Sequence, residues 1–215
     1  MGKLVCDISV SLDGFVAGLN ATLEEPLGRD GERLHDWIVG LAAWRERHGL
    51  DGGEENGDAE VVDEAQRATG AFLMGRKMFS GGSGPWEADP NAEGWWGDDP
   101  PFRVPVFVLT HHAREPETKE GGTSYAFVTD GIESALEQAR AVAGDDDVYI
   151  AGGASVVQQY LRAGLLDELQ LHVAPLLLGG GTRLLENLGP EPVQLEATRV
   201  IESPRVTHLR YRVVK

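Results

Sequence analysis

The stretch "VYIAGGASVVQQYLRAGLLDEL" (residues 148–169) decides the fold of this chain, because an apolar run turns into a helical pattern at two glycines. Residues 148–151 are typical of a buried strand, and 154–163 have the spacing of a helix that Gly164 closes. A strand, Gly-Gly and a helix N-terminus together form a common phosphate cradle, because free first-turn N–H groups point at an anion. Two glycines can also be a tight turn, so the rest of the chain has to decide.

Strand patterns alternate with helical patterns along the chain. We expect eight strands, at about 4–11, 71–74, 104–110, 124–128, 148–151, 168–175, 193–202 and 205–214. We expect the main helices at about 32–47, 59–69, 130–144 and 154–163. This order predicts an α/β fold, with a doubly wound, mostly parallel sheet, helices on both faces and a C-terminal antiparallel hairpin. Without repeats or a linker pattern, residues 1–215 are expected to form a single domain.

The composition limits the classes of protein to which this chain can belong. Its 215 residues carry a net charge of −16, which argues against nucleic acid or an anionic membrane surface as a partner. Apolar runs such as 174–178 are far too short to span a bilayer, and the N-terminus shows no signal-peptide pattern. The single cysteine, Cys6, excludes an internal disulfide and is expected to be a small buried side chain. We therefore expect a cytoplasmic protein.

Turns that suit an anion follow three of the expected strands, at 75–78, 110–114 and 152–156. In open α/β sheets, ligands bind outside the carboxyl ends of the strands, where N–H groups face the ligand. Arg76 and Lys77 add two cations to the first turn, and both are suited to phosphate. The alternative is a pair of solvated bases on a surface turn.

The second turn offers hydroxyl, imidazole and guanidinium donors from Thr110, His111 and Arg114. The adjacent His111 and His112 raise the alternative of a metal site, but no further ligand stands at a zincin or zinc-finger spacing, so no metal is expected. The GxGxxG fingerprint, the GK[ST] phosphate loop and the G-x-S-x-G elbow are all absent.

Four segments carry a resemblance to a known family: "SLDGFVAG" (11–18), "FLMGRKMF" (72–79), "VPVFVLTHHARE" (104–115) and the long stretch 148–188. They resemble the dihydrofolate-reductase-like superfamily. More closely, the chain is similar to the reductase domain of the riboflavin-biosynthesis deaminase/reductase in its stand-alone form. The resemblance implies an NADPH-dependent reductase with an eight-stranded sheet.

The resemblance also implies a set of cofactor-binding residues. The cofactor phosphates would contact Gly75, Arg76, Lys77 and Met78. The adenosine 2′-phosphate would lie near Leu109, Thr110, His111 and Arg114. The pyrophosphate would lie on Gly152, Gly153, Ala154, Ser155 and Val156, and the nicotinamide and substrate near Val16 and Ala17.

Hydride transfer also needs a proton, and in dihydrofolate reductases a carboxylate on the first helix serves this purpose. Asp36 is the nearest match, and its helical angle lies away from the apolar stripe. That position suits a cleft-facing acid or a plain solvated aspartate, and the residues leave both open. Asp13 is the second catalytic candidate, although turn capping is the simpler role for an aspartate before a glycine.

Two residues depart from the pattern of the riboflavin-pathway enzymes. Those enzymes commonly carry lysine where this chain has Asp7, and glutamate where it has Ala151. Both positions concern the substrate, so the sequence predicts a small pyrimidine- or pterin-like heterocycle without identifying it. Two alternatives stay open: dihydrofolate reductase activity, and a non-catalytic nucleotide-binding oligomer that kept the fold. The resemblance favours a homodimer, and the tryptophan-rich loop 81–103 is either a lid or a dimer contact.

Overall fold

The computed structural model describes residues 2–215, with Arg47 described in its backbone only, and its centre is one nine-stranded sheet. The strands of this sheet are β1 (Leu4–Ser11), β3 (Thr69–Gly75), β4 (Pro105–Leu109), β5 (Glu117–Thr118), β6 (Ser124–Val128), β7 (Asp147–Gly152), β8 (Glu168–Ala174), β10 (Leu195–Glu202) and β11 (Thr207–Val213). All eight predicted strands are present. The ninth, β5, is a two-residue strand at the sheet edge that the sequence pattern did not indicate.

The strand order is β10-β11-β8-β1-β7-β3-β4-β6-β5. The six strands from β8 to β6 are mutually parallel, whereas β11 runs antiparallel to β8 and to β10. The doubly wound sheet and the C-terminal antiparallel hairpin are therefore confirmed. A second sheet of two short strands, β2 (Phe15–Ala17) and β9 (Thr182–Arg183), joins the loop after β1 to the loop after β8.

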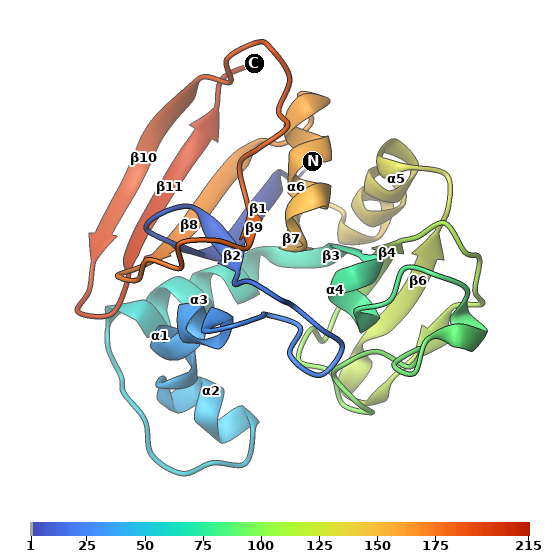
Figure 1. Cartoon of the computed structure of the whole chain (residues 1–215), viewed down its shortest axis with the longest axis horizontal. Helices are drawn as coiled ribbons and strands as arrows, with labels where there is room; N and C mark the ends of the chain where they lie inside the picture. Colours follow the sequence, from blue (N-terminus) through green and yellow to red (C-terminus); the bar gives the residue numbers. More distant parts are fainter. Residues whose placement is uncertain (1) are drawn as a thin grey trace.

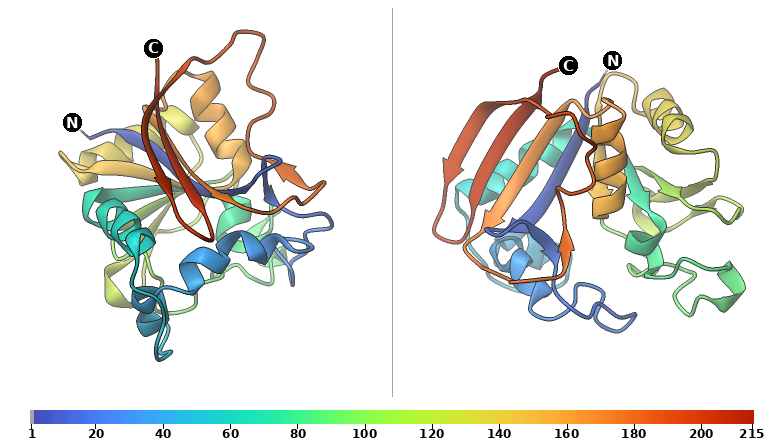
Figure 2. Two further views of the ribbon diagram at one scale, coloured as in Figure 1. Left: turned by 90° about the vertical axis from the view of Figure 1, so that its left-hand side faces the viewer. Right: turned by 45° about the horizontal axis from the view of Figure 1, so that its top comes forward.

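Helices cover both faces of the sheet, as Figures 1 and 2 show. In chain order the helical segments are η1 (Gly31–His35), α1 (Asp36–Val39), α2 (Ala42–Arg47), α3 (Gly57–Ala68), α4 (Arg76–Ser80), η2 (Trp86–Ala88), η3 (Glu120–Gly122), α5 (Ile132–Ala143) and α6 (Ala154–Arg162). The helices α5 and α6 lie on one face, and α1 and α3 lie on the other (Figure 1).

The helix predicted over 32–47 is broken into three pieces, so this prediction was wrong in its continuity. Leu41 is extended, and the loop that follows α2 supplies hydrogen bonds to its neighbours: Ala42 donates to the Glu54 carbonyl and Glu54 donates to the Gly40 carbonyl. Glycine is a poor helix former, and these external partners replace the helical bonds at that point. The apolar stripe is still buried, with Leu34 and Leu41 at 2% exposure or less.

The two faces of β1 carry different chemistry. Leu4, Cys6 and Val10 join the large apolar core under α5 and α6, and the expected burial of Cys6 is confirmed at 0% exposure. The alternate residues Asp7 and Ser9 line a cavity on the opposite face. Because successive side chains of a strand point to opposite faces, one strand supplies both the core and a polar surface.

Candidate functional site

The three turns singled out in the sequence lie side by side, because β7, β3 and β4 are neighbours in the sheet. Gly75 at the end of β3 is in register with Leu109 at the end of β4. A Cβ placed on Gly75 would lie 3.0 Å from the Val156 side chain and 3.7 Å from the Gly153 nitrogen. The first and third turns are therefore in direct contact, and only a residue with no side chain fits between them.

The Gly152-Gly153 turn leaves the N-terminus of α6 open. Gly152 has a φ of +132°, a backbone conformation that side-chain-bearing residues rarely adopt, and its peptide bond to Gly153 is cis. A Cβ on Gly153 would meet no atom within 4 Å. Within the described chain, no side chain caps this helix, and Ser155 in its first turn is exposed. These free N–H groups make a position where an anion is favoured.

Arg76 is engaged within the protein. Its guanidinium is 7% exposed, lies 2.5 Å from the Asp89 carboxylate and stacks 3.5 Å above the ring centre of Trp86. Burial acts to raise the pKa of Asp89, but bonds from Ser80 and the Asn91 N–H, together with Arg76, lower it below its usual value. The side chain of Arg76 thus secures loop 81–103 to the end of β3.

The other predicted residues of the first turn are placed differently. Lys77 is exposed, and no carboxylate of the described residues is within ion-pair distance of it. The Met78 thioether lies beside Gly152, 3.5 Å from the position of a Cβ there. Lys77 is therefore the cation of this turn that remains accessible to a ligand.

Arg114 is also engaged. It pairs with Glu93 at 3.0 Å and Glu117 at 3.1 Å, and its guanidinium lies 5.0 Å from the ring centre of Trp86. Trp86 in turn donates from its indole nitrogen to the His112 carbonyl at 2.8 Å. The tryptophan ring thus lies close to both arginines that the sequence offered for phosphate.

The remaining residues of the second turn lie at the end of β4. Thr110 is buried, and its hydroxyl accepts a hydrogen bond from the His112 N–H at 3.1 Å. His111 is exposed, and Leu109 is half-buried. His111 is thus the donor of this turn that faces solvent.

The loop after β1 holds Val16, Ala17 and Asp13. Val16 packs on the main core, and Ala17 is 9% exposed within β2. The Asp13 carboxylate accepts bonds from the Ser11 hydroxyl at 2.6 Å and from the N–H groups of Leu178 and Gly179 at 3.1 and 2.7 Å. These donors lower the pKa of Asp13, with Ser11 the largest contribution. The geometry is that of the turn-capping alternative.

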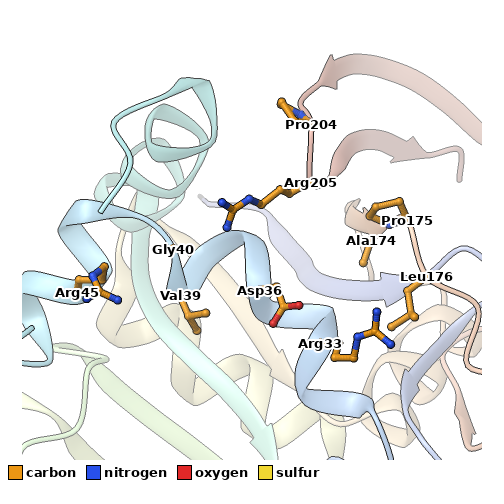
Figure 3. A pocket seen from close by; sticks show the side chains of 10 residues that line it. All are labelled: Arg33, Asp36, Val39, Gly40, Arg45, Ala174, Pro175, Leu176, Pro204 and Arg205. Atoms are coloured by element: carbon orange, nitrogen blue, oxygen red, sulfur yellow. The ribbon is translucent and has the colours of Figure 1, made fainter. Parts of the chain in front are cut away.

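Asp36 lies at the first position of α1 and is exposed. It lines a pocket of about 530 Å³ whose other charged residues are Arg33, Arg45 and Arg205 (Figure 3). No residue of the Gly152-Gly153 turn lines this pocket. The structure therefore places Asp36 in a different pocket from the Gly152-Gly153 turn.

A second cavity, of about 250 Å³, lies on the sheet face and reaches the end of β7 at Ala151, next to Gly152. Three polar side chains from two neighbouring strands form its floor: Asp7, Ser9 and His172. Its walls are mostly apolar and come from η1, α1, α3, β3 and β7: His35, Trp37, Ile38, Val61, Val62, Ala65, Gln66, Thr69, Phe72, Tyr149, Ile150 and Ala151. An apolar cavity with a few convergent polar groups is the usual form of a small-molecule site.

His172 is a site residue that sequence reasoning missed. The alternation over 168–175 predicts a half-buried strand and assigns no role to its polar residues. They lie on the buried face: Gln170 is 6% and His172 4% exposed. The signal was present as polar residues on alternate positions of three segments, 7–9, 170–172 and 208–210, which become neighbours in the sheet.

Among residues 2–215, no group of three or more histidine, cysteine, aspartate or glutamate side chains is placed to hold a metal ion. The search of the same residues found no helix with the length and apolarity that a membrane crossing needs.

The fold and the cavity define a doubly wound α/β protein with a mostly apolar cavity beside a glycine turn. Residues 2–209 match the model of the RibD C-terminal domain family, and the chain belongs to this family.

Known proteins similar to this chain lie at low sequence identity. The uncharacterized protein YyaP of Bacillus subtilis (strain 168) is 24% identical over 192 residues, which cover 85% of this chain and 79% of YyaP. A Shewanella sp. PV-4 structure described as a riboflavin biosynthesis protein superposes with a TM-score of 0.63 at 21% identity and covers all of both chains. Acinetobacter baumannii RibD gives 0.59 at 18% identity, with 100% of this chain and 59% of RibD covered. The riboflavin biosynthesis reductase Rib7 of Saccharomyces cerevisiae gives 0.55 at 16%, with 99% and 90% covered. These structures share the fold.

Proposed function

We propose that this chain is an NADPH-dependent reductase that transfers a hydride to a small pyrimidine- or pterin-like heterocycle. The observation that carries the proposal is the contact between the Gly75 and Gly152-Gly153 turns beside the 250 Å³ cavity. Membership of the RibD C-terminal domain family supports the reductase class.

The residues present fit a dinucleotide. The open space at Gly153 and the uncapped α6 N-terminus would accept the pyrophosphate, and Gly75 allows the backbone of the neighbouring turn to approach it. When bound, NADPH supplies the hydride, and the protein supplies its position and surroundings.

The accessible donors at the neighbouring turns, Lys77 and His111, are our candidates for the adenosine 2′-phosphate, with Thr110 behind them. Arg76 and Arg114 would act indirectly by fixing Trp86 and loop 81–103. This division follows from burial for Arg76, whose side chain is only 7% exposed beside Asp89 and Trp86. It follows from ion pairing for Arg114, because a guanidinium that already binds two carboxylates has fewer donors left for a phosphate.

The cavity supports a small, flat substrate. Its volume of about 250 Å³ lies at the low end for ligand pockets. Trp37 and Tyr149 offer ring surfaces for stacking, and Asp7 offers acceptor oxygens for the N–H groups of an amino-substituted ring.

One observation favours a substrate with an anionic arm. Segment 33–39 contributes residues to both pockets, and the larger pocket is lined by Arg33 of this segment together with Arg45 and Arg205. Clustered guanidinium groups suit a phosphate, even though Arg205 is paired with Glu54 here. A phosphorylated pyrimidine such as 5-amino-6-(5-phosphoribosylamino)uracil is therefore the first substrate to test, with dihydrofolate as the second.

The test has two stages. Thermal unfolding is measured with NADPH and with NADH, and we expect stabilisation, greater with NADPH. NADPH oxidation is then followed with both substrates named above. A protein stabilised by neither nucleotide would refute the cofactor assignment, and stabilisation without turnover of either compound would favour the non-catalytic alternative.

We also propose a homodimer, with the C-terminal hairpin as its contact. Strand β10 forms the free edge of the sheet, and all its residues except Ile201 are exposed, including Val200 at 63%. Light scattering after gel filtration tests this, and replacement of Val200 by lysine should yield a monomer if this edge forms the contact.

A further inference from the structure

Four side chains, three buried and that of Asp7 half-buried, form one hydrogen-bonded series across the sheet face under α3. His172 donates from Nε2 to the Asp7 carboxylate at 2.5 Å, and its Nδ1 lies 2.6 Å from Nδ1 of His208. His208 donates from Nε2 to the Asp58 carboxylate at 3.0 Å. The chain thus runs carboxylate, imidazole, imidazole, carboxylate, and joins β1, β8, β11 and α3.

The number of protons shared by these four side chains follows from the geometry of their hydrogen bonds. Three hydrogen bonds need three protons, and ionised carboxylates carry none. Two neutral imidazoles supply one ring proton each, so the chain holds one proton more than two neutral histidines would. That proton lies on the bond between the two Nδ1 atoms, and the histidine pair therefore carries one positive charge against two negative carboxylates.

Both carboxylates accept further hydrogen bonds from donors outside the histidine pair. Asp58 accepts a bond from the Ser203 hydroxyl at 3.0 Å and lies in the first turn of α3, where negative charge is favoured. Asp7 accepts a bond from the Gln170 amide at 3.0 Å. The Asp58 side chain is 3% exposed and that of Asp7 is 19% exposed, so of these two ends, Asp7 is the more open.

Asp7 is the end of the chain that meets the cavity. It lines the 250 Å³ cavity together with His172, whereas Asp58 and His208 do not. Each carboxylate oxygen can accept two hydrogen bonds, and Asp7 uses one on each oxygen within the protein. Two acceptor positions are left for a ligand.

We propose that Asp58, His208, His172 and Asp7 form a buried one-proton store, and that Asp7 anchors an aminopyrimidine-like ring in the cavity and passes this proton to it. Only the use of the stored proton rests on the proposed function, because reduction of a ring double bond consumes a proton as well as a hydride. Asp7 is the residue in contact with the ligand, and the two histidines and Asp58 are positioning residues behind it.

The proton transfer is an acid–base step in which no electrons leave the ligand. The proton on Nε2 of His172 moves to an oxygen of Asp7, and from there it forms an N–H bond with the lone pair of a ring nitrogen. The ligand gains one positive charge, and the histidine pair loses one. The Asp7 carboxylate is unchanged at the end of the step.

Further charged groups surround the store. Glu168 on β8 and Arg210 on β11 form an ion pair at 2.5 Å on the same sheet face. His35 on η1 and Tyr149 on β7 line the cavity, and Asp36 lies beside His35 in the chain. Burial lowers the pKa of His35 and raises that of Tyr149, so both favour their neutral forms. Burial also lowers the pKa of His208, with the His172 charge contributing, so the pair resists a second proton.

The first arm of the test detects the stored proton without ligand or cofactor. In ¹⁵N-labelled full-length protein, long-range ¹H–¹⁵N spectra report which nitrogens of the six histidine rings are protonated. We expect one bridging Nδ1 proton at low field, shared by two rings. His208→Gln should remove this proton. Glu168→Gln should retain it, because Glu168 is a buried carboxylate on β8, the strand of His172, but is not one of the four hydrogen-bonded side chains. Two neutral rings with unprotonated Nδ1 atoms would overturn the proposal.

Asp58→Asn provides a second variant should His208→Gln fail to fold. It keeps the shape of the side chain but removes the charge that stabilises the histidine pair, so the bridging proton should be lost from a protein with a native far-ultraviolet spectrum. Retention of the bridging proton in a folded Asp58→Asn protein would contradict the assignment.

The second arm connects the store to the cavity by titration with 2,4-diaminopyrimidine. We expect binding that moves the His172 and bridging-proton signals, a roughly tenfold weaker affinity in Asp7→Asn, and an unchanged affinity in Glu168→Gln. Absence of binding, or binding that leaves these signals in place, would overturn the role of Asp7. Neither arm contains NADPH, so failure of the proposed cofactor chemistry is seen separately, in the thermal unfolding with nucleotides.

Discussion

Arg76 and Arg114 show how the role of a residue depends on its neighbours. Both are basic residues at strand ends, where a phosphate contact is the natural expectation. In the structure they pair with acidic residues, and both lie close to the ring of Trp86. A cation in a chain with a net charge of −16 has many competing carboxylates, and the structure shows which cations those carboxylates leave accessible.

Removal of Arg76 should mainly affect stability. Arg76→Ala leaves the 2% exposed Asp89 carboxylate without its cation, which costs roughly 3–5 kcal/mol in comparable buried pairs. The matched control is Arg103→Ala, whose pair with Asp99 is exposed and is expected to cost about 1 kcal/mol or less. Urea unfolding measures both. Equal losses of unfolding free energy in the two variants would show that the buried pair contributes no more to stability than the exposed one.

Lys77 should discriminate between the two nicotinamide cofactors. Lys77→Ala is expected to weaken NADPH binding roughly tenfold and NADH binding much less, because only NADPH carries the 2′-phosphate. Lys215→Ala removes a lysine that pairs with Asp167, and it serves as the control. Calorimetric titration gives the dissociation constants. The same loss for both cofactors would move Lys77 away from the 2′-phosphate.

Asp13 should make stability dependent on acid pH. Its donors lower the pKa from 3.8, so the folded protein binds this proton less readily than the unfolded chain. The stabilisation is therefore complete above the unfolded value and is lost as the pH falls below about 4. Asp13→Asn should have a lower Tm than the wild type at pH 7, and the difference should shrink at pH 3. A difference independent of pH would assign the effect to shape rather than charge.

At the scale of elements, the two glycines before α6 have different tasks. Gly152→Ala places a side chain at φ +132° and should cost roughly 1–3 kcal/mol of stability. Gly153 has φ −85° and open space around it, so Gly153→Ala should cost at most about 1 kcal/mol, the loss expected when alanine replaces a better N-cap residue. Its methyl group would instead occupy the position proposed for the pyrophosphate. Urea unfolding and NADPH titration together separate the two effects, and unimpaired NADPH binding by Gly153→Ala would contradict the proposed cradle.

The segment 32–47 marks the limit of periodicity as a predictor of elements. The apolar residues at helical spacing predict the side that faces the core, and three of the five, Leu34, Trp37 and Leu41, are buried. The other two, Ile38 and Trp44, are half-buried. The spacing did not predict the break, because the bonds that replace the helical ones come from Glu54, which lies in a loop with no periodic pattern. Which side chains are buried depends on the residues of the helix itself. Whether the helix is continuous depends on which other groups compete for its backbone hydrogen bonds.

At the scale of the whole molecule, the net charge of −16 should affect the binding of an anionic cofactor. The field of the protein repels NADPH, and salt screens this repulsion over a Debye length of about 8 Å at physiological ionic strength. We therefore expect NADPH affinity to rise as sodium chloride increases from about 10 to 150 mM. Titrations across this range measure it. An affinity that falls steadily with salt would show that the local cations outweigh the overall field.

The fold could be predicted largely from the sequence, and the three strand-end turns with it. Apolar runs and glycine turns are local signals, and adjacent parallel strands bring their carboxyl ends to one edge. The candidate site could be predicted only in part. Asp36 was the expected acid, yet the carboxylate on the cavity floor is Asp7, and its partner His172 lies on a strand far along the chain.

By itself, the sequence determined the doubly wound sheet and the glycine turns, because these follow from side-chain periodicity and backbone freedom within a few residues. Only the tertiary structure decided which charges are engaged and which polar residues meet. Asp7, His172, His208 and Asp58 come from four elements, and their hydrogen bonds exist because strand register and the packing of α3 bring them within 3.0 Å of one another. Contacts of this kind depend on distances in space, which no local pattern in the chain encodes.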